Sequence, residues 1–219
     1  MIDRPALEIL CGDSRTLLEG YPDGFFNLIV ASPPYADARE KQYHSASPKK
    51  YAAFIGSFHL EFWRVLAKEG SLVLNLKDKI VDGVRSRHVW ESIGLLTSMG
   101  WKCVDDYIWS KPNGMPGYWP NRLRDQWEYC FHMTKNRKFA MYQSAVKKPV
   151  GPWAAKRLKS LSKKDRSRRN SDSKSGFGKN VSNWGNKKMV LPGNVITSST
   201  VSKNTGHPAA FPEATPLFL

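Results

Sequence analysis

Apolar residues of this chain gather in short runs that glycine, proline and polar residues separate. Runs of strand length are typical of buried strands, and apolar residues at helical spacing are typical of amphipathic helices. We predict strands over residues 7–11, 25–30, 71–76, 103–109 and 125–135. We predict helices over residues 15–19, 48–69 and 88–99. Since strands and helices alternate along the chain, this order predicts an α/β fold with a largely parallel sheet.

Local signals mark the ends of these helices. Ser47 is a favoured N-cap residue, and Pro48 suits the first position of a helix. Residues 68–70 end that helix. A second helix begins at His88 and ends at Gly100. We interpret His88 as a residue that starts the helix, and we assign it no ligand role. Residues 81–87 are polar and are interpreted as a loop.

The run 25–30, which we predict to be fully buried, ends in the stretch Ala31-Ser32-Pro33-Pro34-Tyr35. Neither proline can donate a ladder hydrogen bond, and both restrict the backbone. Ser32 and Tyr35 are therefore held at the carboxyl end of a strand, where ligands bind in open α/β sheets. A hydroxyl, the carbonyl before Pro34 and a flat ring together suit an exocyclic amino group on a planar base.

Composition and charge add a polyanion to the list of possible partners. The 219 residues, 41% of them hydrophobic, can bury one sizeable core. Of the net charge of +15, residues 147–188 carry 14 Lys and Arg against two acidic residues, whereas residues 1–146 are nearly balanced. This basic segment is either a binding surface for a polyanion or a solvated tail, and charge alone leaves both readings open.

The sequence gives no signal for a membrane, a leader or a metal. No apolar run approaches the roughly 18 residues that span a bilayer, and the first residues lack the pattern of a signal peptide. Cys11, Cys103 and Cys130 lie too far apart for metal-ligand spacing, and we interpret them as buried core thiols. We expect a cytoplasmic protein without a membrane partner and without a metal.

Ser32-Pro33-Pro34-Tyr35 resembles the catalytic motif of the DNA amino-methyltransferases of prokaryotes and phages. These enzymes move a methyl group from S-adenosylmethionine to cytosine N4 or adenine N6. The resemblance implies that the Ser32 hydroxyl and the Pro33 carbonyl accept hydrogen bonds from the target amine, and that Tyr35 stacks on a base swung out of the duplex. Serine at the first position is usual in cytosine-N4 enzymes, so we expect that target, with adenine N6 as the alternative.

Two further segments resemble parts of the family's site for the methyl donor. Gly12-Asp13 is similar to a turn that places an acid near the donor's adenine, although Asp13 would serve equally as a helix cap. Residues 206–213 resemble the family's His-Pro-x-x-x-Pro segment, which lines the methionine end. The expected contacts to S-adenosylmethionine are Asp13, Ser32, His207, Pro208, Phe211 and Pro212.

The resemblance also implies residues that contact double-stranded DNA. Arg39 and Lys41 lie in a polar loop after the motif, and residues 108–113 are similar to the family's loop beside the target base. The basic segment takes the place of the family's target-recognition region. The expected DNA contacts are Arg39, Lys41, Trp109, Lys111, Arg166, Arg168, Arg169, Lys174 and Lys179.

The resemblance divides the chain into three parts. We expect a catalytic region over 1–146, a basic target-recognition segment over 147–192 and a return to the cofactor site over 193–219. In the permuted class a strand ending in Phe-x-Gly-x-Gly follows, and this sequence stops at Leu219 before it. We therefore expect an incomplete Rossmann-like methyltransferase sheet with a basic DNA-recognition insertion, and a second polypeptide or a longer gene that supplies the glycine strand.

The resulting functional hypothesis is site-specific DNA methylation in a restriction-modification system, with cytosine N4 as the acceptor. A hypothesis of another class is an inactive DNA-binding fragment or subunit of a split methyltransferase. Binding of S-adenosylmethionine by the chain discriminates between the two.

Overall fold

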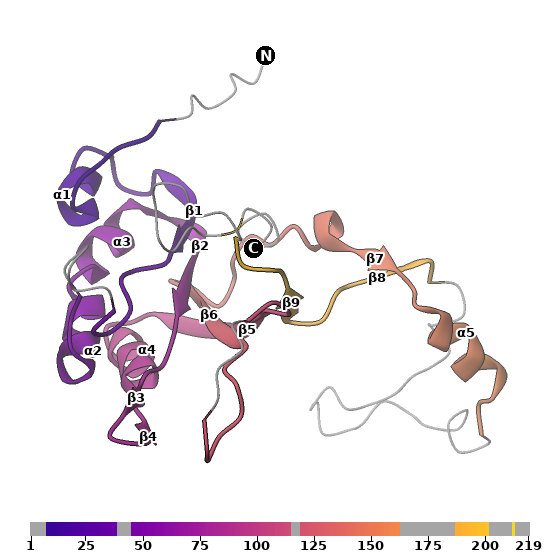
Figure 1. Ribbon diagram of the computed structural model, residues 1–219. Coiled ribbons are helices and arrows are strands. Elements are labelled where there is room, and N and C mark those ends of the chain that lie inside the picture. Colours follow the sequence, from indigo (N-terminus) through magenta and orange to yellow (C-terminus); the bar gives the residue numbers. More distant parts are fainter. Residues whose placement is uncertain (1–7, 39–44, 115–118, 163–186, 202–211, 213–219) are drawn as a thin grey trace. The chain divides into compact units, whose positions relative to one another are not determined.

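The computed structural model describes residues 8–38, 45–114, 119–162, 187–201 and 212 (Figure 1). The chain divides into two compact units. The first comprises Met1–Ala140 with Asn194–Leu219, and the second is Met141–Gly193. No helix among the described residues is long and apolar enough to cross a membrane.

The first unit is built on a five-stranded sheet with the order β1-β2-β6-β5-β9. Its strands are β1 (Phe26–Ala31), β2 (Leu66–Leu76), β5 (Lys102–Ser110), β6 (Trp127–Thr134) and β9 (Val195–Thr197). β1 runs parallel to β2 and β5 runs parallel to β9, but β6 is antiparallel to both of its neighbours. The prediction of a largely parallel sheet is therefore wrong. The described residues between β5 and β6 contain no helix to carry the chain across the sheet, as a parallel pair usually requires.

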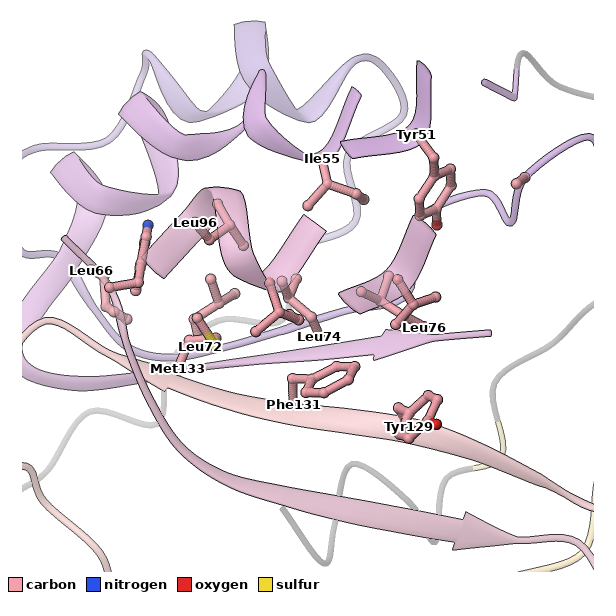
Figure 2. Close-up of a cluster of buried hydrophobic side chains, with 14 residues drawn as sticks. Tyr51, Ile55, Leu66, Leu72, Leu74, Leu76, Leu96, Tyr129, Phe131 and Met133 are labelled. Carbon is pink, nitrogen blue, oxygen red and sulfur yellow. The ribbon is translucent and has the colours of Figure 1, made fainter. Parts of the chain in front are cut away.

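Helices cover one face of this sheet (Figure 1). They are α2 (Pro48–Gly56), α3 (His59–Val65) and α4 (His88–Ser98), and the short α1 (Ser14–Leu18) precedes β1. Figure 2 shows Tyr51 and Ile55 of α2 and Leu96 of α4 directed at side chains of β2 and β6. Leu72, Leu74, Phe131 and Met133 of these strands are at most 2% exposed, so the main core lies between the helices and the two central strands. A smaller cluster contains Val73, Tyr107, Trp109, Cys130 and Ile196.

The long helix predicted over 48–69 forms as two helices, and β2, which begins at Leu66, takes up the last four residues of that range. The break follows Gly56, a poor helix former. The Ser57 hydroxyl donates to the Phe54 carbonyl at 2.7 Å, a local bond that competes with the helical ladder. Ser47 is the N-cap of α2, as predicted, but its side chain makes no capping hydrogen bond.

β1 lies at an edge of the described sheet, because it pairs with β2 alone among the described strands. Leu28 is 44% exposed, so the expectation of a fully buried strand is wrong. Residues 8–11 form no strand, and Ile9 is 86% exposed, because no described strand lies beside them to pair. Cys130 is buried as expected, whereas the free thiols Cys11 and Cys103 are exposed.

The predicted loop of 81–87 contains a small hairpin of β3 (Ile80–Val81) and β4 (Val84–Arg85). Asp82 and Gly83, with φ of 48° and 77°, make the turn. Asp-Gly is a preferred pair for such turns because both central residues need positive φ.

The second unit contains η1 (Gln143–Val146), α5 (Pro152–Lys159) and the antiparallel pair β7 (Lys148–Pro149) and β8 (Met189–Val190). It overlaps the basic segment predicted over 147–192. Residues 163–186 of that segment lie outside the described residues.

Candidate active site at the carboxyl end of β1

The Ser-Pro-Pro-Tyr motif begins one residue after β1 ends. Because β2 is parallel to β1, the carboxyl end of β2 lies at the same edge of the sheet. The Pro34 carbonyl accepts a hydrogen bond of 3.0 Å from the hydroxyl of Tyr51, which is fully buried in α2. Burial raises the pKa of Tyr51, so this hydroxyl stays a donor. The path of the motif is thus fixed by its prolines and by a helix beneath it.

Asn75, the next-to-last residue of β2, bonds to both hydroxyls of the motif. Its side chain is fully buried, and Nδ2 donates to the Tyr129 carbonyl at 3.0 Å. A carbonyl can only accept, so this bond sets the orientation of the amide. Oδ1 consequently faces the motif, where it accepts from the Ser32 hydroxyl at 3.2 Å and from the Tyr35 hydroxyl at 2.8 Å.

Glu128 on β6 is the second partner of Tyr35. The single proton of the Tyr35 hydroxyl is shared between Glu128 Oε2 at 2.5 Å and Asn75 Oδ1 at 2.8 Å, and Glu128 is 5% exposed. The Lys111 ammonium forms an ion pair with Oε1 of the same carboxylate. Burial first, and then the charge and hydrogen bond of Glu128, raise the pKa of Tyr35 well above its ordinary value. The phenol therefore stays protonated.

Sequence reasoning missed Asn75 and assigned no role to Glu128. Both are polar residues inside apolar strand runs, and the residues next to them in each strand are almost all buried as well. Buried polar groups require hydrogen-bond partners, so such a residue near the end of a buried strand signals a structural or functional network. That signal was available in the sequence, but the identity of the partners was not.

Charged residues beyond the motif connect the surrounding loops. Lys77 donates to the Trp127 carbonyl at 2.5 Å and lies 3.6 Å from a carboxylate oxygen of Asp125. Asp125 also pairs with Arg85 at 2.7 Å. Lys79 pairs with Asp37, two residues after Tyr35, at 2.9 Å. These contacts tie the loop after β2 to the segments before β6 and after the motif.

Trp109 and Lys111, predicted to contact DNA, lie beside this network. Trp109 is 4% exposed, and its Nε1 donates to the Ser198 carbonyl at 2.9 Å. The Lys111 ammonium lies 4.3 Å from the centre of the Trp109 ring, within the range of a cation–π contact. Lys111 is therefore engaged with Glu128 and Trp109 in this structure, and a role toward DNA stays a prediction for both residues.

Asp13, predicted to lie near the methyl donor, is the N-cap of α1. Its Oδ1 accepts from the Arg15 backbone at 2.9 Å, and its Oδ2 pairs with the Arg15 guanidinium at 2.5 Å. The side-chain hydrogen bond from Arg15 lowers the pKa of Asp13 to about 2. The capping role that the sequence left open is thus observed, and a contact to the donor stays a prediction.

A pocket of about 200 Å³ lies directly behind the motif. It is mainly apolar, and its polar groups include the side chains of Ser14, Ser32 and His59. His59 Nδ1 accepts a hydrogen bond of 2.9 Å from Trp101 Nε1, and burial lowers the pKa of His59. Sequence analysis did not identify this pocket.

Several predicted site residues lie outside the described residues: Arg39, Lys41, Arg166, Arg168, Arg169, Lys174, Lys179, His207, Pro208 and Phe211. Pro212 is described and buried, and its contact to the donor stays a prediction. Within the described ranges, no group of three or more His, Cys, Asp or Glu residues could hold a metal ion.

Comparison with known proteins places this arrangement in a family. Residues 26–219 match the N6_N4_Mtase family, described as DNA methylase. The chain is 26% identical over 232 residues to the type II methyltransferase M.PvuII of Proteus hauseri, covering 94% of this chain and 67% of that protein. It is 28% identical over 167 residues to the type II methyltransferase M.SfiI of Streptomyces fimbriatus, covering 66% of this chain and 40% of that protein.

Solved structures of DNA methylases also resemble the chain. The PvuII DNA methyltransferase, described as cytosine-N4-specific, matches 94% of this chain and 66% of its own, with a TM-score of 0.64 and 21% identity. A putative DNA modification methylase of Thermus thermophilus, complexed with S-adenosyl-L-methionine, covers 72% of this chain with a TM-score of 0.43 and 25% identity. The chain shares the PvuII methyltransferase fold and spans about two thirds of that protein. Since the family match extends over most of its length, the chain belongs to the N6/N4 DNA methylase family.

Proposed function

We propose that this chain carries the target-base site of a DNA methyltransferase of a restriction-modification system, which methylates the exocyclic N4 of cytosine in duplex DNA. The observation that supports it is the pair of hydroxyls of Ser32 and Tyr35, converging on buried Asn75 at the carboxyl end of β1. M.PvuII, a type II methyltransferase, has the same fold.

The geometry at Ser32 suits recognition of an amine. A hydroxyl has one proton and two lone pairs, and the proton of Ser32 is directed at Asn75 Oδ1. Its lone pairs remain to accept a hydrogen bond from the target amine, and the Pro33 carbonyl accepts the second. These bonds draw the nitrogen lone pair out of conjugation with the ring and orient it. Positioning and electrostatics of this kind provide most of the catalysis, without a covalent enzyme intermediate.

The Tyr35 ring supplies the stacking surface for the base. The target nucleotide must leave the helix, because a stacked base cannot present its amine to a reaction partner. Hydrogen bonds from the Tyr35 hydroxyl to Asn75 and Glu128 hold the ring in one orientation. The unstacked base thus meets a ring that has already lost its rotamer freedom.

S-adenosylmethionine, when bound, supplies an electrophilic methyl group. The pocket behind the motif fits one part of this molecule: its apolar walls suit a flat ring or the methylene groups of the methionine chain, and the Ser14 and Ser32 hydroxyls offer polar contacts. At about 200 Å³ it is too small to enclose the whole molecule, so the remaining contacts come from other segments. Asp13 and the segment of His207, Pro208, Phe211 and Pro212 remain our proposals for these contacts.

Ser32 favours cytosine N4 over adenine N6. It presents a neutral hydroxyl where the adenine enzymes of the family usually carry Asp or Asn, and M.PvuII is described as cytosine-N4-specific. Adenine N6 remains the alternative target. Mass spectrometry of nucleosides from DNA of cells that express the protein tests this choice. We expect N4-methylcytosine, which disappears in Ser32→Ala; N6-methyladenine as the sole product would contradict the proposed target.

An inactive DNA-binding subunit is the competing function. Calorimetry with S-adenosylmethionine separates the two, because the subunit would bind DNA without binding the donor. DNA is the proposed partner in both cases, and the basic second unit is its proposed contact surface, with 14 Lys and Arg over residues 147–188.

A further inference from the structure

The proposed function requires a base to leave the duplex, and the gap that it leaves must stay open until the methyl group has been transferred. Proteins that distort DNA keep base steps apart by inserting apolar side chains between them. A residue with this task is apolar and exposed, lies near the base site and is held in place by the rest of the protein.

Two segments emerge at the end of the sheet that carries the motif. β2 ends there because it is parallel to β1, and antiparallel pairing places the end of β5 and the start of β6 there as well. Residues 77–87, which contain the β3–β4 hairpin, follow β2, and residues 111–126 join β5 to β6. Figure 1 shows the hairpin and the described part of this joining loop projecting from the same end of the sheet.

The loop of residues 111–126 begins and ends beside the base site. The Lys111 backbone amide donates to the Gln126 carbonyl at 2.7 Å, which closes the base of the loop. The Lys111 ammonium pairs with the carboxylate of Glu128, and the same carboxylate accepts from the Tyr35 hydroxyl. The residues between these two ends are therefore tethered next to the ring on which the target base stacks.

The tip of this loop is held against the hairpin. Arg122 Nη2 donates to the Gly83 carbonyl, in the turn of the hairpin, at 2.9 Å. Asp125 pairs with Arg85 of β4 at 2.7 Å. Leu123 lies between Arg122 and Asp125 in the sequence, so contacts to the hairpin fix the chain on both sides of it.

Leu123 is 91% exposed although its loop is anchored. Single exposed apolar residues are common on protein surfaces. Here, however, Val84 of the hairpin is 69% exposed and Trp119 of the loop is 55% exposed. The guanidinium of Arg122, which is bound to the hairpin, also lies 5.8 Å from the centre of the Trp119 ring. The two joined segments thus present several apolar side chains to the outside, and Leu123 is the most exposed of these three.

The same two segments carry positive charge. Residues 77–87 and 111–126 contain seven Lys and Arg against three acidic residues. Of these acids, Asp78 is buried and Asp125 is paired with Arg85. Arg124, the residue after Leu123, is exposed. Apolar side chains among cations match duplex DNA, which presents phosphates around an apolar stack of bases.

We propose, on the basis of the proposed function, that Leu123 enters the duplex and fills the space that the target nucleotide leaves, while Tyr35 stacks on the extruded base. The inserted side chain keeps the neighbouring bases apart and delays return of the target base. Leu123 is therefore a positioning residue: it favours the extruded state and makes no contact with the amine or the methyl group.

The test measures single-turnover methylation by the purified full-length protein on two duplexes. Both contain the recognition sequence, read beforehand from methylated DNA of cells that express the protein; the target base is paired in one and mispaired in the other. We expect Leu123→Ala to lose roughly tenfold or more in rate on the paired duplex, since burial of a leucine side chain is worth about that factor. On the mispaired duplex its rate should lie within about twofold of the wild type, because a mispaired base leaves the stack at a lower cost.

Two further variants serve as controls. Leu123→Met keeps an apolar side chain of similar volume and should methylate the paired duplex at nearly the wild-type rate. Leu60→Ala removes a leucine that is 75% exposed on α3, outside the two segments, and should also keep the wild-type rate.

The outcomes separate the wedge from the proposed function. A Leu123→Ala protein with the wild-type rate on the paired duplex would overturn the wedge and leave the proposed function standing. An equal loss on both duplexes would also overturn it, because the leucine would then act in a step other than base extrusion. A wild-type protein that methylates no DNA in these cells would overturn the proposed function itself, and the wedge with it.

Discussion

Tyr35 combines two roles at the residue scale, since its ring and its hydroxyl face different partners. The hydroxyl is tied to Asn75 on β2 and to Glu128 on β6, and the ring is carried on a segment that two prolines restrict. A phenylalanine would keep the stacking surface but would lose both hydrogen bonds. Ser32 is similarly divided between an acceptor role toward the amine and a donor role toward Asn75.

The first prediction concerns these two side chains. Ser32→Ala and Tyr35→Ala should each abolish methylation, because one removes an acceptor of the amine and the other removes the stacking ring. Neither belongs to the basic second unit, so DNA affinity measured by fluorescence anisotropy should be largely retained. Full methylation activity in Ser32→Ala would show that the base binds elsewhere.

Asn75 gives a second prediction, which concerns stability. Asn75→Ala removes the partner of the Tyr129 carbonyl and of two hydroxyls in a fully buried position. Such a change should lower the free energy of unfolding by about 1–3 kcal/mol, because buried groups lose their hydrogen bonds. Urea denaturation measures it. Asn194→Ala is the control, since its bond to the Asp106 carbonyl is exposed and 3.4 Å long; an equal loss in both variants would contradict the role given to Asn75.

At the scale of elements, the approach of β1 to β2 depends on Gly70. A Cβ at this position would lie 2.9 Å from the Asn27 carbonyl oxygen and 2.9 Å from a methyl of Leu66. The first of these atoms belongs to the β1 backbone, and it can move only if the strand pair opens. β1 carries the motif at its end, so this close approach also places the site.

Gly70→Ala should therefore destabilise the protein by about 1–3 kcal/mol, as overpacking typically does. Gly94→Ala in α4 is the matched control, because nothing lies within 4 Å of the added methyl group. In a helix interior this change should stabilise by about 0.5–1 kcal/mol. Opposite shifts of the urea midpoint are expected, and a Gly70→Ala protein as stable as the wild type would refute the packing argument.

Local patterns predicted most elements, and interactions between distant residues account for the errors. β5, β6, α4 and the second half of β2 lie where apolar runs and helical spacing place them, whereas the first residues of β2 were predicted as helix. The predicted direction of β6 was wrong, because the periodicity of apolar residues carries no information on strand direction. The hairpin at Asp82-Gly83 had a local signal, whereas the exposure of residues 8–11 depends on which strands are present beside them.

The candidate site divides in the same way. Ser32, Pro33, Pro34 and Tyr35 were predicted from the motif itself, and the structure places them at the carboxyl end of a strand. Asn75 and Glu128 join the motif across 40 and 93 positions of sequence, so no local pattern connects them to it. A single sequence gives the residue types of such a network but not its pairing.

At the scale of the whole molecule, the buried His88 and His132 and the half-buried His59 make stability dependent on pH. Burial lowers the pKa of His59, His88 and His132. The unfolded chain, in which a histidine has a pKa of about 6.5, therefore binds more protons than the folded chain as the pH falls. Stability is retained above this pKa and is lost below it.

We expect the urea midpoint to fall between about pH 7 and about pH 5. His132 is 5% exposed, with Tyr107 at 3.0 Å from Nδ1 and Ser71 at 2.8 Å from Nε2. His132→Gln should flatten the fall, because it removes one of the three titrating groups. A midpoint that stays constant over this range would contradict the lowered pKa values.

The second unit provides the last prediction, on DNA affinity. Lys147, Lys148, Lys156 and Lys159 are exposed there. Changing all four to glutamine should weaken DNA binding and reduce the slope of log affinity against log salt by ~0.9 for each phosphate that the variant no longer neutralises. Titrations at several salt concentrations measure the slope. An unchanged slope would show that these lysines are solvated and do not bind phosphate.

The hydrogen bonds around the motif join residues that are far apart in the sequence, and this separation determines at which stage of folding the site can form. These bonds join residues 40 to 93 positions apart, from the segment after β1 to β2 and β6. Pairings of such range carry a large loop-closure cost and form late in folding. A nascent or partly folded chain therefore has a motif without its partners, with Tyr35 free to rotate. The chemistry proposed here is withheld until the central strands have paired, so that synthesis of the chain and acquisition of its activity are separate events in time.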